Sequence, residues 1–182
     1  MPAGWSSTES TPGELTLVSP AQPDDALKFW LDMSAVKSSG PGHGTTVLTN
    51  VGRTPSAVIA WLSHDPDFLI VSRSAPATVG QDIKMNSLVV GVSHSANYGD
   101  AGCPASPRCA DLFTTKYWGG GFFGIGGDEE VRLYLGTIQI SGSPHTFFAV
   151  LDTVDHADLL RFENTVKPVI ASLRLPSGVV SG

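Results

Sequence analysis

Short runs in which apolar and polar residues alternate make up much of this chain, and they limit the folds it can adopt. Such runs lie at 13–19, 26–36, 87–93 and 130–140. The run at 68–72 is also strand-like, 146–152 is apolar enough for a central strand, and 45–48 is expected to extend the sheet briefly. A period of two residues is typical of β-strands with one buried face. Connections are predicted at 4–11, 38–44, 76–80 and 94–127, and a hairpin turn at 141–144. We therefore expect a sheet built from many short strands.

Two segments have the signals of helices. Thr54 is a good N-cap and Pro55 suits the first helical position, so a helix is predicted to run from there to Ser63. A second helix is predicted from near Asp155 to Leu173. Its apolar residues recur at spacings of three and four, and they are Leu159, Phe162, Val166, Val169, Ile170 and Leu173. Pro168 is expected to kink this helix.

The order of these elements indicates the fold class. Strands, one helix, more strands and a closing helix favour an α+β fold with an antiparallel or mixed twisted sheet packed by two main helices, and they argue against a doubly wound parallel sheet. With 182 residues, of which 41% are hydrophobic and 15% charged, the chain is expected to form one folded body. The predicted domain covers residues 1–176, and 177–182 are predicted to be a flexible tail.

Charge and hydropathy exclude two classes of partner. Eleven basic and seventeen acidic side chains give a formal charge of −6, and Lys and Arg do not cluster, so no nucleic acid is expected. The longest apolar runs, such as 88–92 and 147–151, are far shorter than the roughly 20 residues that cross a bilayer. No transmembrane segment or signal peptide is therefore expected within this sequence, although a leader or membrane anchor could precede it.

The two cysteines bear on the cellular compartment. Cys103 and Cys109 flank Pro-Ala-Ser-Pro-Arg, a loop short enough to allow the Cα separation of about 5.5 Å that a disulfide needs. A redox pair or half of a metal site are the alternatives, but the spacing is not Cys-x-x-Cys and no second pair exists. An even cysteine count fits an oxidising compartment, so we expect a secreted or extracytoplasmic protein.

The most unusual segment runs from Lys116 to Asp128, where four aromatic residues are interspersed with six glycines. Glycine lets a backbone approach a ligand closely, and aromatic rings offer large contact surfaces. The residues predicted to bind a ligand or partner are Tyr117, Trp118, Phe122, Phe123 and Ile125. The alternative is that these aromatic rings fold back and cover one end of the sheet. The glycine spacing does not match a dinucleotide-binding fingerprint, and no cofactor is predicted.

No catalytic or metal-binding residues are predicted. The histidines, at 43, 64, 94, 145 and 156, have no spacing that would form a local zinc site, and no Gly-x-Ser-x-Gly motif occurs. His64, Asp65 and Asp67 could hold a cation, or could simply end a helix. The acidic residues 128–130 are interpreted as a solvated strand entrance.

Several motifs together resemble one known family. They are Gly4-Trp5 with Pro12 to Leu17, Thr54 to Leu62 with His64 to Phe68, Pro76 to Gly80, the cysteine loop with Leu112-Phe113, and the closing helix with Ser172 to Pro176. These are similar to PsbP-like domains of actinobacterial cell-envelope proteins, the same broad fold group as the mycobacterial LpqN lipoproteins. Gln81 stands where a second glycine is usual in that family. The resemblance implies a fold and transfers no catalytic residue.

These observations favour a non-enzymatic cell-envelope or secreted domain that binds a hydrophobic small molecule, lipid or protein partner. An enzyme with an acid/base or metal site assembled from distant segments is one alternative. A structural or sensory ectodomain is another.

Overall fold

The computed structural model describes residues 3–11, 13–39, 44–80, 83–96, 108–116, 118, 121–174 and 179–181. The strands are β1 (Ser6–Thr11), β2 (Glu14–Ser19), β3 (Gln22–Leu31), β4 (Ser34–Ser38), β5 (Thr45–Val47), β6 (Phe68–Val79), β7 (Ile83–Val92), β8 (Cys109–Thr114), β9 (Phe123–Gly126), β10 (Glu130–Ile140), β11 (Ser143–Asp152) and β12 (Val179–Ser181). The helices are α1 (Pro55–His64) and α2 (His156–Ser172).

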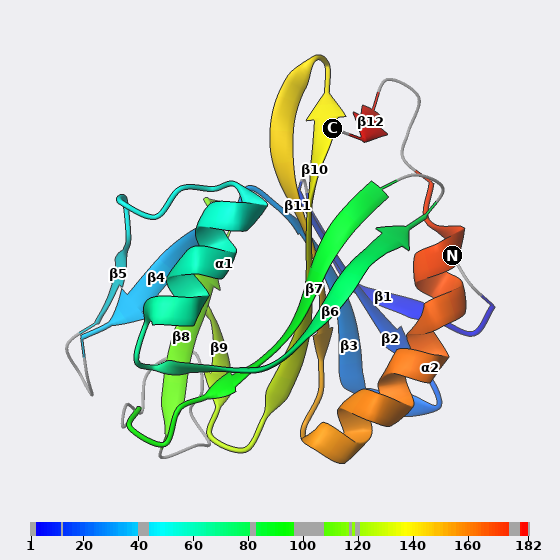
Figure 1. Ribbon diagram of the computed structural model, residues 1–182. Helices are drawn as coiled ribbons and strands as arrows, with labels where there is room; N and C mark the ends of the chain where they lie inside the picture. The colour runs from blue at the N-terminus through cyan, green and yellow to red at the C-terminus, as the bar shows by residue number, and fades with distance from the viewer. Residues whose placement is uncertain are drawn as a thin grey trace.

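The strands form two antiparallel sheets (Figure 1). The larger has the order β1-β2-β3-β11-β10-β7-β6, with β12 paired to β10, and the smaller has the order β5-β4-β8-β9. The predicted α+β class with two main helices is confirmed. The predicted hairpin turn is also confirmed, since Ser141 and Gly142 have φ of 52° and 80° between β10 and β11. Such a pair of positive φ angles matches the twist of antiparallel strands.

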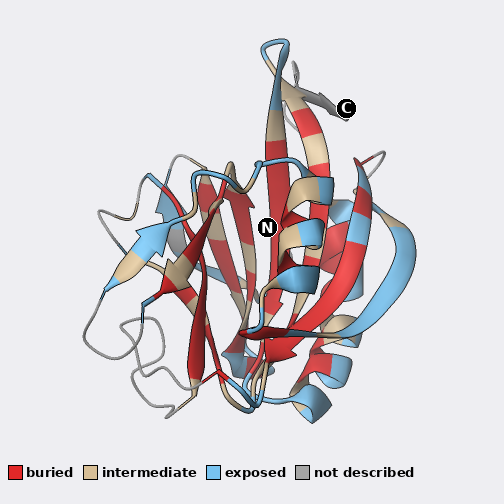
Figure 2. Cartoon of the chain, turned by 60° about the vertical axis from the view of Figure 1, so that its left-hand side comes forward, coloured by how far each residue is buried: buried red, intermediate tan, exposed pale blue. Residues whose placement is uncertain are grey.

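Both faces of the central strands of the larger sheet are buried, whereas β6 at the edge is largely exposed (Figures 1 and 2). One face packs against α2, and the other packs against α1 and the smaller sheet. On β11, Phe148 and Val150 enter the core on the α1 side, whereas Phe147, Ala149 and Leu151 enter the core on the α2 side. This double burial explains why the run at 147–151 is continuously apolar.

Both helices begin as predicted. The Thr54 side chain accepts a hydrogen bond from the Ala57 N–H at the start of α1. Asp155 does the same for Asp158 N–H at the start of α2. Each cap satisfies a backbone donor that has no partner within the helix. Among the described residues, neither helix is long and apolar enough to span a membrane.

The prediction of one irregular stretch at 94–127 was wrong, because β8 and β9 lie within it. All six residues of β8 are buried, including Asp111. A strand covered on both faces loses the alternation that marks half-buried strands. In β9 two of the four residues are glycines, which are rare in strands. Neither strand therefore has a recognisable local pattern.

Three further boundaries differ from the predictions. The turn-forming segment 4–11 contains β1, and 76–80 is largely the end of β6. The run at 26–36 is two strands, since the chain turns at Asp32 with φ of 54° between β3 and β4. The β6–β7 register shifts between Ser74 and Ala77, and this irregularity interrupts the strand pattern just before 76–80. Of the predicted flexible tail, residues 177, 178 and 182 lie outside the described part, and Val179–Ser181 pairs with β10.

Gly80 provides a test of how the larger sheet meets α2. Its φ is 65°, its N–H donates to Ile170 O at 2.9 Å, and a Cβ added there would lie 2.6 Å from Leu173 O. Gly142 is a matched control, because its φ is 80° with nothing within 4 Å of an added Cβ. Gly142→Ala should cost about 1 kcal/mol of unfolding free energy from backbone strain alone. Gly80→Ala should cost at least about 2 kcal/mol, because the steric clash adds to that strain.

Urea unfolding of both variants measures this difference. Equal losses of stability would show that the chain near Gly80 relaxes away from α2.

Candidate functional site

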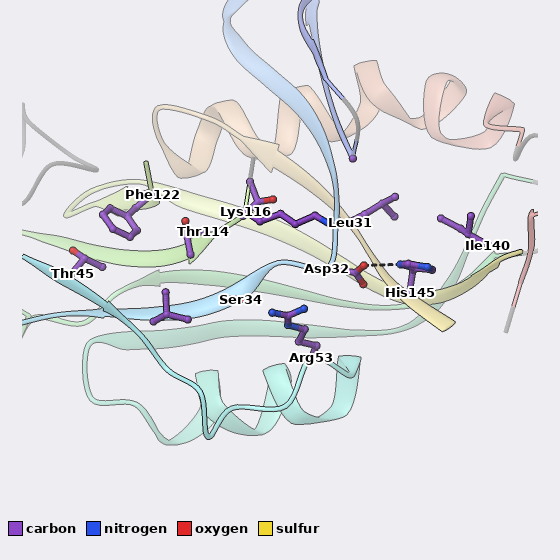
Figure 3. A pocket seen from close by; sticks show the side chains of 13 residues that line it. Leu31, Asp32, Ser34, Thr45, Arg53, Thr114, Lys116, Phe122, Ile140 and His145 are labelled. Atoms are coloured by element: carbon purple, nitrogen blue, oxygen red, sulfur yellow. Dashed lines mark hydrogen bonds and ion pairs between the residues drawn. The ribbon is translucent and has the colours of Figure 1, made fainter. Parts of the chain in front are cut away.

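A cleft of about 620 Å³ lies where the ends of strands from the two sheets meet (Figure 3). Its lining comes from segments far apart in the sequence: Gly13, Leu31, Asp32, Ser34, Thr45, Val47, Arg53, Thr114, Thr115, Lys116, Phe122, Ile140 and His145. The larger sheet supplies the ends of β3, β10 and β11, and the smaller sheet supplies β4, β5 and β8. The cleft therefore depends on how the two sheets are placed together.

Asp32 organises one wall of the cleft. Its N–H donates to Thr146 O at 2.9 Å, and its Oδ1 accepts from Thr146 N at 3.0 Å. Its Oδ2 accepts a hydrogen bond from His145 Nδ1 at 2.6 Å (Figure 3). Because a carboxylate only accepts, the shared proton is on Nδ1 and the imidazole is oriented. These contacts stabilise the positive φ of Asp32, a conformation that asparagine and aspartate tolerate best among residues with a side chain.

Arg53 also lines the cleft and comes directly before the N-cap of α1. Its backbone carbonyl accepts a hydrogen bond from the Thr146 hydroxyl, so the start of α1 is tied to β11. The Arg53 guanidinium is exposed, and within the described part of the chain it has no hydrogen-bond or ion-pair partner. Lys116 adds a second exposed cation to the lining.

The five residues predicted to bind a ligand have different positions. Phe122 lines the cleft. Trp118 is half-buried and lines a smaller hollow of about 310 Å³ beside it, which Phe122 also lines. Phe123 and Ile125 are buried in the core, at 7% and 0% exposure. Tyr117 lies outside the described residues. The segment is thus partly core, as the alternative interpretation expects, and partly cleft wall.

The Glu14 carboxylate anchors the aromatic segment. It accepts hydrogen bonds from Trp30 Nε1 at 2.8 Å and from Trp118 Nε1 at 2.6 Å. The two indole rings also pack edge to face, with centroids 5.4 Å apart. Glu14 is only 8% exposed, and a carboxylate this buried needs such donors. These contacts hold Trp118 against the larger sheet.

The acidic residues singled out in the sequence, at 65 and 67 as possible cation ligands and at 128 and 130 as a strand entrance, have partners within the protein. Lys37 Nζ lies 3.1 Å from Asp65 Oδ2 and 3.2 Å from Asp67 Oδ2. Asp128 pairs with Arg108 at 3.1 Å, and Glu130 with His156 at 2.5 Å. In the ranges that the structure describes, no group of three or more metal-ligating side chains comes together.

The predicted disulfide is not tested by these residues. Cys109 is fully buried at the start of β8, whereas Cys103 lies outside the described residues. The bridge between Cys103 and Cys109 stays a prediction.

Comparison with known proteins finds a solved structure of low similarity. No family model matches the chain, and no curated protein matches it. The chain is similar to the solution structure of cyanobacterial PsbP (CyanoP) from Synechocystis sp. PCC 6803, with a TM-score of 0.36 and 12% sequence identity, over 100% of this chain and 84% of that chain. The α+β description therefore rests on the strands and helices of the chain itself.

The sequence did not indicate most of the cleft. Asp32 and Ser34, Arg53, and His145 come from three separate segments, and none belongs to a motif with a characteristic spacing. Only the aromatic segment pointed to this region, and among its described residues Lys116 and Phe122 line the cleft.

A double-mutant cycle tests the anchoring of Trp118 by Glu14. In Glu14→Gln an amide NH₂ replaces one acceptor oxygen, so one buried indole N–H loses its partner. We expect a loss of about 1–3 kcal/mol in unfolding free energy. In a Trp118→Phe background the loss should shrink by about 1 kcal/mol, because only Trp30 then needs an acceptor.

Trp61→Phe is the matched control background, since Trp61 Nε1 donates to Asp65 and not to Glu14. Urea unfolding measures all of these variants. If the losses of stability from Glu14→Gln and Trp118→Phe simply add, the Glu14 carboxylate does not bind Trp118.

Glu129 gives a pH-dependent prediction. Burial raises the pKa of its carboxyl above the ordinary value, although the Gly126 N–H, 2.6 Å from Oε2, opposes the shift. The folded chain then holds this proton at pH values where the unfolded chain has lost it, so stability falls as pH rises above about 4.5. Glu129→Gln should therefore be more stable than the parent protein at pH 7, and the gain should vanish below about pH 4.

Asp128→Asn is the control, because it removes the charge of the neighbouring carboxylate, whose side chain is 96% exposed. Thermal unfolding across pH measures both. The difference in stability between Glu129→Gln and the parent protein should favour the variant more at pH 7 than at pH 4. The opposite order would contradict a raised pKa for Glu129.

Proposed function

We propose that this chain is a non-enzymatic binding domain whose cleft between the two sheets takes a small molecule with a substantial apolar part. The observation that carries the proposal is the cleft itself. Its volume of about 620 Å³ falls within the roughly 300–1,000 Å³ range of small-molecule sites. Leu31, Val47, Phe122 and Ile140 provide an apolar lining, and a few polar groups converge among them, as in typical ligand pockets.

The rigidity of the walls supports binding. Asp32, which follows Leu31, is fixed by hydrogen bonds from β11. Trp118 is fixed by its hydrogen bond to Glu14. These residues are therefore held in place before a ligand arrives. A site that is already ordered loses less conformational entropy on binding.

Nucleophilic catalysis has less support. The His145–Asp32 pair could orient an imidazole as a base. Nucleophilic catalysis with such a base also needs a hydroxyl or thiol hydrogen-bonded to it, and in the described part of the chain no such group is bonded to His145. The pair instead serves to hold the turn after β3.

We further propose that the domain acts outside the cytoplasm as a PsbP-like member of the cell-envelope proteins. The support is the even cysteine count, the predicted Cys103–Cys109 bridge and the sequence motifs shared with that family. Mass measurement with alkylation, with and without reductant, on protein exported by its native host should show no free thiol. Two alkylated cysteines before reduction would contradict this location.

Filling the cleft tests the binding function. Titration with the neutral fluorophore N-phenylnaphthylamine should give saturable binding to the parent protein. Val47→Trp should weaken it at least tenfold, because an indole at this 44% exposed position would occupy the cleft. Val71→Trp is the matched control, since Val71 is 39% exposed on edge strand β6 and does not line the cleft.

Both variants should unfold at the temperature of the parent protein. Equal fluorophore binding by Val47→Trp and the parent, or no binding at all, would refute the cleft as the ligand site.

A further inference from the structure

The charges that line the cleft differ from those of the chain as a whole. The lining contains two permanent cations, Arg53 and Lys116, and one carboxylate, Asp32, so its formal charge is +1 with His145 neutral. The whole chain has a formal charge of −6. A positive cleft in an acidic protein attracts anions locally, while the rest of the surface repels them.

Asp32 and Arg53 both line the cleft, but no ion pair joins them; the only ion-pair partner of Asp32 among the described residues is His145. The two carboxylate oxygens of Asp32 already accept from Thr146 N–H and His145 Nδ1. Figure 3 shows the Arg53 side chain extending from the start of α1 toward Ser34 and Asp32, with Lys116 on the other side of this group in the same view. The Ser34 hydroxyl, like the guanidinium, has no hydrogen-bond partner within the described part of the chain. Two donors that face the cleft are thus left for a ligand.

We infer that the cleft selects ligands with an anionic head, a carboxylate or a phosphate, joined to an apolar body. The inference rests on the proposed binding function and names the ligand class. The planar guanidinium of Arg53 matches the paired oxygens of both anions, the Ser34 hydroxyl can donate a further hydrogen bond, and Lys116 adds charge. The apolar body would lie along Leu31, Ile140 and Phe122.

Arg53 is well placed for this role. Its carbonyl is held by the Thr146 hydroxyl, which is next in the chain to His145. The backbone from which the guanidinium extends is therefore tied to the same strand that positions Asp32. A guanidinium on a fixed backbone loses less freedom when it binds an anion.

The test is displacement of N-phenylnaphthylamine by four probes that share a dodecyl chain: dodecanoate, dodecyl phosphate, dodecanol and dodecyltrimethylammonium, each below its micelle concentration. The two anions should compete at least tenfold better than dodecanol, and the cation should compete worst. The ratio between dodecanoate and dodecyl phosphate then tells which anion is preferred. Arg53→Gln should weaken both anions about tenfold and leave dodecanol unchanged.

Ser34→Ala should produce a smaller loss for the same two anions. Lys167→Gln is the matched control, because Lys167 pairs with Asn164 on α2 and does not line the cleft. It should change nothing. Arg53 is exposed, so Arg53→Gln should fold normally, which thermal unfolding checks.

The outcomes separate the two proposals. Equal affinity for dodecanol and both anions, or anion binding unaffected by Arg53→Gln, would overturn the anion preference and leave the binding function standing. The strongest binding by the cationic probe would also overturn it. No binding of the fluorophore or of any dodecyl probe would overturn the binding function and the anion preference together.

Discussion

Burial of both faces of the central strands is the constraint on which the rest of this structure depends. β3, β11, β10 and β7 send alternate side chains into two cores, one covered by α2 and the other by α1 and the smaller sheet. A slip of one residue in any pairing would exchange every side chain between the two cores. The register is therefore strongly specified, and so are the positions of the strand ends that carry Leu31, Asp32, Ile140 and His145.

Two carboxylates fix the residues in and beside the cleft. Asp32 closes the turn between β3 and β4 against β11, and Glu14 binds the indoles of Trp30 and Trp118. Each carboxylate accepts hydrogen bonds at both oxygens, and the Asp32 side chain keeps 34% exposure in the cleft lining. A ligand in the cleft would meet the charge of Asp32 together with those of Arg53 and Lys116. The same contacts that stabilise the fold thus set the electrostatic character of the proposed site.

The elements with a strong local pattern could be predicted, and those without one could not. The caps at Thr54 and Asp155 and the turn at Ser141–Gly142 appear in the structure because capping and positive φ are short-range effects. β8 was missed because it is buried on all sides, and β9 because half of its residues are glycines. The separation of β3 from β4 depends on the Asp32 contact with Thr146, 114 residues away.

The sequence by itself determined the α+β class, the two helices with their caps, most strands of the larger sheet and the unusual character of the aromatic segment. Each follows from interactions between residues close together in the chain, or from the simple periodicity of burial. Only the tertiary structure decided that Phe123 and Ile125 are core residues while Phe122 faces a cleft, and that Arg53, Ser34, Asp32 and His145 meet there. Those outcomes depend on how the two sheets pack. Packing brings together side chains that are far apart in the sequence, and no local sequence pattern predicts such contacts.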